Sequence, residues 1–227
     1  MTRLLVLATT VACTIALAVP SRADERVQIT ATDGVQLVGH LFGREGPGIV
    51  FGHMYPADQR SWTAFAEEMA SAGFRTLTFD FRGYGESVGE KDIAAIDRDM
   101  EGAYRFLIGR KIRPVYLVGA SMGGTAALMV GVRVPVAGIA TLSAPVAFRG
   151  LDAASALPKL TSRKLFLAAE GDQPAADAVK QFTARAADPK TTQLFPGSEH
   201  CTALLDGPQS AAVKQVLRAF LTAPPVP

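Results

Sequence analysis

Gly119-Ala120-Ser121-Met122-Gly123 decides the fold of this chain, because it places a serine between a buried strand and a helix. The apolar run 114–118 precedes it and predicts the strand, and residues 125–132 follow it and predict the helix. A G-x-S-x-G at such a junction is typical of a sharp turn that holds the serine outward as a nucleophile. Its glycines let the strand and the helix approach closely. A glycine-rich turn with an incidental serine is the alternative.

Strand and helix patterns alternate along the rest of the chain. The first two strands predict a hairpin around the turn dipeptide Asp33-Gly34. The expected strands are 27–30, 35–42, 48–51, 76–79, 114–118, 137–142, 164–169 and 192–195, and the expected helices are 62–69, 93–108, 125–132, 175–187 and 208–221. This alternation predicts an α/β fold, with a mostly parallel central sheet of about eight strands and helices on both faces.

The first 23 residues predict a secretory signal peptide. A basic start at Arg3 is followed by an apolar run over 4–19, and Ser21-Arg22-Ala23 places small residues at the cleavage position. The apolar run is too short for a comfortable membrane span, so we expect no stable membrane insertion. We expect cleavage after Ala23, a single mature domain over residues 24–227, and a periplasmic or extracellular location.

Charge and cysteine content exclude several functions for the expected mature chain. Removing residues 1–23 leaves 21 of the 23 basic side chains against 21 acidic ones, so no net charge favours nucleic acid as a partner. Cys201 is then the one cysteine, which excludes an intrachain disulfide and a cysteine-ligated metal. His40, His53 and His200 are too scattered for a zinc site, and we expect neither a metal nor a cofactor. The oligomeric state is left open.

A serine nucleophile needs a base, and the base needs an acid that orients it. In elbow enzymes the chain order is serine, acid, histidine, and His200 is the only histidine after Ser121. For the acid, Asp172 comes directly after the strand 164–169, at the sheet edge where sites of α/β proteins lie. Asp177, one turn into the next helix, is the alternative acid.

Backbone N–H groups complete the predicted site. An oxyanion hole needs two donors, and the N–H of Met122, at the start of the helix, is the first. The turn after the strand 48–51 supplies the second from Tyr55 or, as the alternative, from Met54. His53 precedes Ser121 in the chain and is therefore expected to brace this loop by hydrogen bonds rather than to act as the base.

Taken together, these segments resemble the α/β-hydrolase superfamily over nearly all of the mature chain. The resemblance implies a Ser121–His200–Asp172 triad and acyl transfer to water. Met54 stands where the family usually has a glycine, and the compact chain resembles the dienelactone hydrolase branch except that its elbow carries serine instead of cysteine. The motifs that carry the resemblance are Gly52-His53-Met54, residues 80–87, residues 119–124, Glu170-Gly171-Asp172 and residues 197–200.

The resemblance also limits the class of substrate that we expect. Many relatives insert a helical cap between the sixth and seventh strands, whereas residues 143–163 here have room for one connecting helix and no cap domain. An open site suits small or medium acyl esters. We therefore expect an exported, carboxylesterase-like serine hydrolase that takes a small-molecule ester. An amidase or peptidase with the same triad, and a binding protein that kept the fold without the chemistry, are the alternatives.

Overall fold

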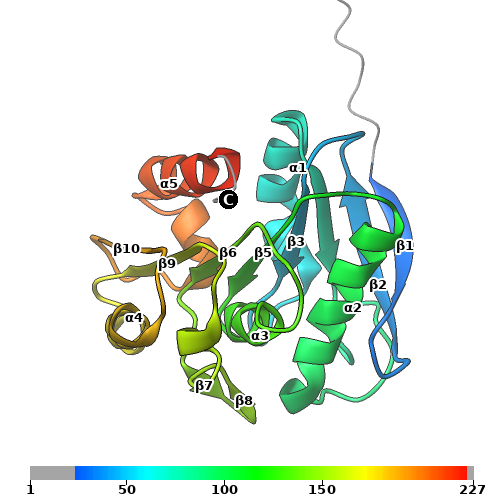
Figure 1. The fold of residues 1–227 in the computed structure, drawn as a ribbon. Helices are drawn as coiled ribbons and strands as arrows, with labels where there is room; N and C mark the ends of the chain where they lie inside the picture. Colours follow the sequence, from blue (N-terminus) through cyan, green and yellow to red (C-terminus); the bar gives the residue numbers. More distant parts are fainter. Residues whose placement is uncertain (1–23, 224–227) are drawn as a thin grey trace, which may run out of the picture.

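The computed structural model describes residues 24–223, so the expected signal peptide lies outside the described residues. An eight-stranded sheet runs through the molecule in the order β1-β2-β4-β3-β5-β6-β9-β10, and helices cover both of its faces (Figure 1). The strands of this sheet are β1 (Glu25–Thr30), β2 (Gln36–Phe42), β3 (Gly48–Gly52), β4 (Arg75–Phe79), β5 (Val115–Ala120), β6 (Gly138–Leu142), β9 (Lys164–Ala169) and β10 (Lys190–Phe195). The predicted fold class is confirmed.

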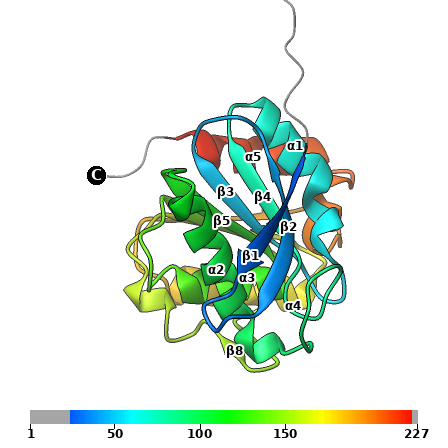
Figure 2. The same ribbon diagram turned by 90° about the vertical axis from the view of Figure 1, so that its right-hand side faces the viewer.

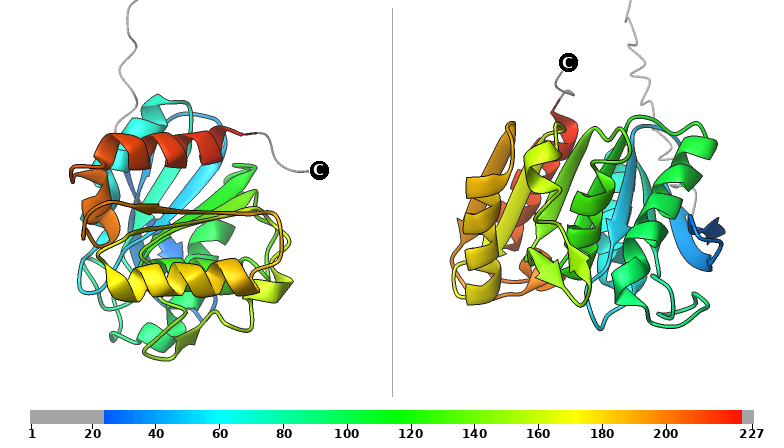
Figure 3. Two further views of the ribbon diagram at one scale, coloured as in Figure 1. Left: turned by 90° about the vertical axis from the view of Figure 1, so that its left-hand side faces the viewer. Right: turned by 60° about the horizontal axis from the view of Figure 1, so that its bottom comes forward.

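The helices divide between the two faces of the sheet. They are α1 (Thr63–Ser71), α2 (Ile96–Gly109), α3 (Met122–Val130), α4 (Gln173–Arg185) and α5 (Ser210–Thr222). Apolar side chains of α1 and α5 pack in one core cluster, and those of α2, α3 and α4 pack in another, on the opposite face. Figure 3 shows α5 and α4 on opposite sides of the strands. Short 3-10 turns lie at Gln59–Trp62 (η1), Ile93–Ala95 (η2), Leu157–Lys159 (η3) and Cys201–Leu205 (η4).

The direction of the strands sets where a site can form. β1 and β2 pair in an antiparallel hairpin at one edge, as Figure 2 shows, and β2 is antiparallel to β4. From β4 to β10 every neighbouring pair is parallel. The loops after β3, β4, β5, β6, β9 and β10 therefore leave from one edge of the sheet, which is where sites of such folds lie.

Two local expectations are wrong. The segment between β6 and β9 holds no α-helix; it forms a small hairpin, β7 (Ala147–Phe148) and β8 (Leu151–Asp152), followed by η3. Its turn residues Arg149 and Gly150 both have positive φ, at 45° and 95°, which suits a two-residue hairpin turn and prevents a helix. In addition, α3 begins at Met122 instead of Thr125, directly after the serine.

Within residues 24–223, no helix has the length and apolar composition to cross a membrane.

Candidate active site

Ser121 occupies a strained turn between β5 and α3. Its φ of 46° and ψ of −119° lie in a region that L-residues rarely adopt, and such strain is common at functional sites. A Cβ on Gly119 would lie 2.3 Å from the carbonyl carbon of Gly123, and one on Gly123 would lie 2.4 Å from the oxygen of Gly52. Both glycines of the motif are therefore required by contact with backbone, and the sharp turn predicted from the sequence is present at Ser121.

His200 and Asp172 meet at the same edge of the sheet. Asp172 lies between β9 and α4, and His200 lies between β10 and η4. The Nδ1 of His200 is 2.6 Å from Oδ2 of Asp172, and the carboxylate is largely buried while half of the imidazole is exposed. A carboxylate at Nδ1 fixes the tautomer that leaves Nε2 free to accept a proton. This is the pairing that an acid and a base of a triad require.

Asp177, the alternative acid, points elsewhere. Its exposed carboxylate accepts hydrogen bonds from Lys180 and Gln173, both at 2.9 Å, on the surface of α4. These two bonds, led by the one from Lys180, lower the pKa of Asp177. The structure therefore brings Asp172, and not Asp177, to His200.

Cys201 links the histidine loop to the serine. No hydrogen bond joins Ser121 to His200 within residues 24–223; the fully buried Cys201, next to His200 in the chain, hydrogen-bonds with Ser121 instead. The N–H of Cys201 also donates to Oγ of Ser143 at 3.0 Å. Catalytic hydrogen bonds are often long in the absence of substrate. Cys201 thus connects the loop that carries His200 with Ser121 and Ser143, a contact that its sequence position alone does not reveal.

The two segments that carry the predicted oxyanion donors are in contact. Met122 is the first residue of α3, so its N–H has no acceptor within the helix. The loop after β3 reaches the same place, because the Cα of Gly123 packs against the backbone of Gly52 and His53. Tyr55 follows in that loop and is partly exposed. The loop after β3 and the start of α3 are thus in contact next to Ser121, and an oxyanion hole that uses both segments remains a prediction.

His53 braces this loop, as expected. It is fully buried, its Nδ1 lies 2.9 Å from the carbonyl oxygen of Met54, and its Nε2 accepts from the N–H of Phe81 at 3.1 Å. Since Nε2 is an acceptor here, Nδ1 is the protonated nitrogen. Burial lowers the pKa of His53, which keeps the ring neutral in this role. Both nitrogens are used by backbone groups, so His53 is no general base.

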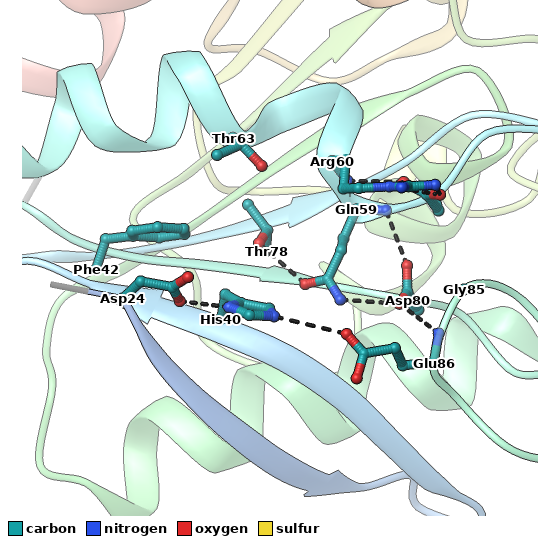
Figure 4. A pocket seen from close by; sticks show the side chains of 11 residues that line it. Asp24, His40, Phe42, Gln59, Arg60, Thr63, Thr78, Asp80, Gly85 and Glu86 are labelled. Carbon is teal, nitrogen blue, oxygen red and sulfur yellow. Dashed lines mark hydrogen bonds and ion pairs between the residues drawn. The ribbon is translucent and has the colours of Figure 1, made fainter.

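Asp80 ties the same loop to the exit of β4, an arrangement that Figure 4 displays. Its carboxylate accepts from the N–H of Gln59 at 2.9 Å, from Nε2 of Gln59 at 2.8 Å and from the N–H of Glu86 at 2.9 Å (Figure 4). The absence of a side chain at Gly85 makes room for it, because a Cβ there would lie 2.1 Å from Oδ2. Asp80 also lines a cavity of about 490 Å³, whose lining includes none of Ser121, Asp172 and His200.

The polar side chains of the 80–87 loop serve largely structural roles. Arg82, which is 6% exposed, donates to the buried Asp99 and to Asp33 of the β1–β2 hairpin, and anchors the loop to both. No group of three or more potential ligands for a metal ion occurs in residues 24–223. What the edge of the sheet offers is a serine, an oriented histidine and backbone donors, the parts needed for acyl transfer.

Comparisons with known proteins agree with this arrangement. The model of the alpha/beta hydrolase family matches residues 47–156. A protein of Mycobacterium tuberculosis without an assigned function is 26% identical over 88% of this chain and 80% of its own length. The solved esterase Pf2001 of Pyrococcus furiosus superposes with a TM-score of 0.76 at 17% identity, covering 88% of this chain and 92% of the esterase. The dienelactone hydrolase of Anabaena variabilis superposes with a TM-score of 0.75 at 21% identity, covering 88% of this chain and 96% of that hydrolase.

The strand order and the superposed structures show the α/β-hydrolase fold, and the segment that the family model matches carries the elbow. This version of the fold is compact, because the described residues 24–223 carry only the β7–β8 hairpin and η3 between β6 and β9.

Proposed function

We propose that the protein is an exported serine hydrolase that cleaves carboxylic esters with small or medium acyl groups. Ser121 attacks the ester carbonyl, and His200 takes its proton and then gives it to the leaving alkoxide. Asp172 holds the imidazole, while the N–H groups of Met122 and Tyr55 bind the oxyanion. Water then releases the acid from the acyl-enzyme with His200 as the base.

The observation that carries this proposal is that a strained serine and a histidine oriented by a carboxylate lie at the same edge of the sheet. The 2.6 Å contact between Nδ1 of His200 and Asp172 leaves Nε2 as the free nitrogen of the ring. Cys201, the residue after His200, touches the serine. A base within reach of a nucleophile, itself oriented by a carboxylate, is the recurring arrangement of serine hydrolases.

Variant kinetics test the roles. We expect Ser121→Ala and His200→Ala to abolish nearly all turnover of 4-nitrophenyl butyrate, and Asp172→Asn to lower kcat by about 10³–10⁴. Asp177→Asn is the matched control, because it removes a carboxylate that contacts Lys180 and not His200. It should stay within about twofold of the wild type. Loss of activity in Asp177→Asn with full activity in Asp172→Asn would reverse the assignment of the acid.

The choice between ester and amide needs a matched pair of substrates. Turnover of 4-nitrophenyl butyrate should exceed that of butyric 4-nitroanilide, and short acyl chains should be favoured over long ones because the site is open. Equal rates on the ester and the anilide would favour the amidase, and equal rates on short and long chains would contradict the proposed substrate class. Correctly folded protein that turns over neither substrate would favour the binding protein.

Export is the remaining part of the proposal. It rests on the basic start, apolar run and small residues of 1–23, and is tested by the amino terminus of the purified protein. Sequencing should read from Asp24. A cell-associated product that still begins at Met1 would contradict it.

A further inference from the structure

The hairpin between β6 and β9 holds an arginine in an unusual backbone conformation. Arg149 is the first turn residue between β7 and β8 and has a φ of 45°, in the left-handed region that favours glycine or asparagine. Strain of this kind persists where the surrounding structure fixes it, and it clusters at binding sites. The position of this side chain therefore needs an explanation.

Two aromatic rings hold the guanidinium. Its carbon Cζ lies 4.5 Å from the ring centroid of Tyr55 and 5.4 Å from that of Phe148, and the two rings are 6.1 Å apart. Such contacts place a cation without neutralising it. Within residues 24–223 no carboxylate forms an ion pair with Arg149, whereas other exposed arginines such as Arg105 and Arg110 each pair with a glutamate. A positive charge is thus fixed in place and left without a counter-ion.

This charge lies at the rim of the candidate site. Tyr55, whose ring it covers, belongs to the loop whose N–H is the proposed oxyanion donor. From the other side, the hydroxyl of Thr125 in the first turn of α3 donates to the carbonyl oxygen of Pro145 at 2.7 Å, just before β7. The hairpin is therefore anchored to the helix that begins after Ser121, and Figure 1 shows it beside α3.

A second polar group, the hydroxyl of Tyr84, has no hydrogen-bond partner within residues 24–223. The hydroxyl of Tyr84 is buried in a side chain that is only 3% exposed, and it makes no hydrogen bond within residues 24–223. Its ring packs on His53 at 5.1 Å between centroids, and Nζ of Lys91 lies 4.7 Å above it. Burial raises the pKa of Tyr84, Tyr55 adds to the rise and Arg149 opposes it, so the phenol stays protonated and can donate a hydrogen bond. Buried hydroxyls without a partner are rare and call for a ligand.

We propose that Arg149 and Tyr84 bind a carboxylate carried by the substrate, so that the preferred substrates are esters with a free carboxylate, such as half-esters of dicarboxylic acids. The planar guanidinium can donate two parallel hydrogen bonds to a carboxylate, and the Tyr84 hydroxyl can donate a third. This inference rests on the proposed ester hydrolysis for its reaction, and it adds the substrate class.

The kinetic test uses two substrates of similar size, mono-4-nitrophenyl glutarate, which has a free carboxylate, and the neutral 4-nitrophenyl hexanoate. The wild type should have the higher kcat/KM on the glutarate ester. Arg149→Gln should lower kcat/KM for that substrate by about tenfold or more, since a hydrogen bond to a charged group is worth this much, and should leave the hexanoate ester within about twofold. Arg149→Lys should retain part of the preference, and Tyr84→Phe should lower it less than Arg149→Gln.

Arg185→Gln is the matched control. Arg185 is exposed in the last turn of α4, away from the edge that carries the site, and its loss changes the net charge by the same amount. It should leave the preference intact. Equal losses on both substrates in Arg149→Gln, or no preference in the wild type, would overturn the inference while leaving ester hydrolysis in place.

A binding measurement separates the two proposals. Calorimetric titration of glutarate into Ser121→Ala, which needs no turnover, should give binding that weakens by about tenfold or more in Ser121→Ala/Arg149→Gln. It should stay unchanged in Ser121→Ala/Arg185→Gln. Absence of glutarate binding, or binding that ignores Arg149, would overturn the inference whatever the hydrolase assays show. Binding without turnover in the wild type would overturn the proposed function and keep the site.

Discussion

At the scale of single residues, the site depends on three neighbouring residues whose backbone φ angles are positive. Ser121, Ser143 and Cys201 have φ values of 46°, 49° and 58°, and each lies just after a strand or at the start of a turn on the same edge of the sheet. Hydrogen bonds connect Cys201 with both serines. Strain at these positions is held by the surrounding contacts, as is common at functional sites.

The Cys201 thiol should be inert in the folded protein. Burial raises the pKa of Cys201 well above its ordinary value, with a further rise from Asp172, and the side chain is fully buried. Because the thiolate is the reactive form, we expect no reaction with 5,5′-dithiobis(2-nitrobenzoate) until denaturant unfolds the chain. The native protein should also run as one band of monomer size on a non-reducing gel. Rapid stoichiometric reaction of the native thiol would contradict the buried position.

At the scale of elements, the elbow depends on how closely α3 approaches the loop after β3. Gly123 lies in the first turn of α3, and a Cβ there would meet two carbonyl oxygens, of Gly52 at 2.4 Å and of His53 at 2.7 Å. Neither atom is the end of a flexible side chain. The same contact that fixes the glycine therefore fixes the distance between the two proposed oxyanion donors.

Gly123→Ala should therefore damage stability and turnover together. We expect a loss of about 1–3 kcal/mol in the free energy of unfolding from overpacking, and a fall in kcat of at least about tenfold from the displaced donor. Thermal unfolding and ester hydrolysis measure the two effects. Gly109→Ala is the control, because a Cβ at the end of α2 meets nothing within 4 Å and alanine favours the helix. Full activity in Gly123→Ala would show that the close contact is not needed.

The elements also show what the sequence could and could not predict. The position of the strands and the pairing of His200 with Asp172 follow from apolar runs, chain order and the rule that parallel strands end at one edge. The hairpin at 147–152 escaped prediction because its strands are two residues long and its turn carries arginine where asparagine or glycine is usual. The contact of Cys201 with Ser121 joins residues 80 positions apart and leaves no periodic signal.

At the scale of the whole molecule, one ion network joins the antiparallel edge to the parallel core. Arg82, from the loop after β4, contacts Asp33 in the β1–β2 turn at 2.9 Å and also Asp99 in α2. The hydrogen bond from Arg82 lowers the pKa of Asp33 from 3.8 to about 2, with a smaller contribution from Arg98. The hairpin is thereby tied to the loop that supports the site.

This network predicts a defined dependence of stability on pH. The pKa of Asp33 is lower in the folded protein than in the unfolded chain. Its ionised carboxylate therefore contributes fully to the free energy of unfolding above pH 3.8, and this contribution is lost as pH falls toward 2. Because Asp33 is exposed and solvent screens its ion pairs, we expect Asp33→Asn to lose about 1 kcal/mol of unfolding free energy at neutral pH, and the difference from the wild type to vanish below pH 2. Denaturant titrations across this range measure it. Asp206→Asn, an exposed change without an ion pair within residues 24–223, should leave the curve unaltered. A constant difference at every pH would contradict the assignment.

The central claim is that Ser121 is an activated nucleophile, and fluorophosphonate labelling followed by peptide mass spectrometry tests it most directly. We expect one modified residue, Ser121, with labelling abolished in Ser121→Ala, strongly slowed in His200→Ala and unchanged in Ser71→Ala. Ser71 is an exposed serine of α1 that donates to the carbonyl of Glu67. Folded protein that remains unlabelled, or a label that persists in Ser121→Ala, would contradict it.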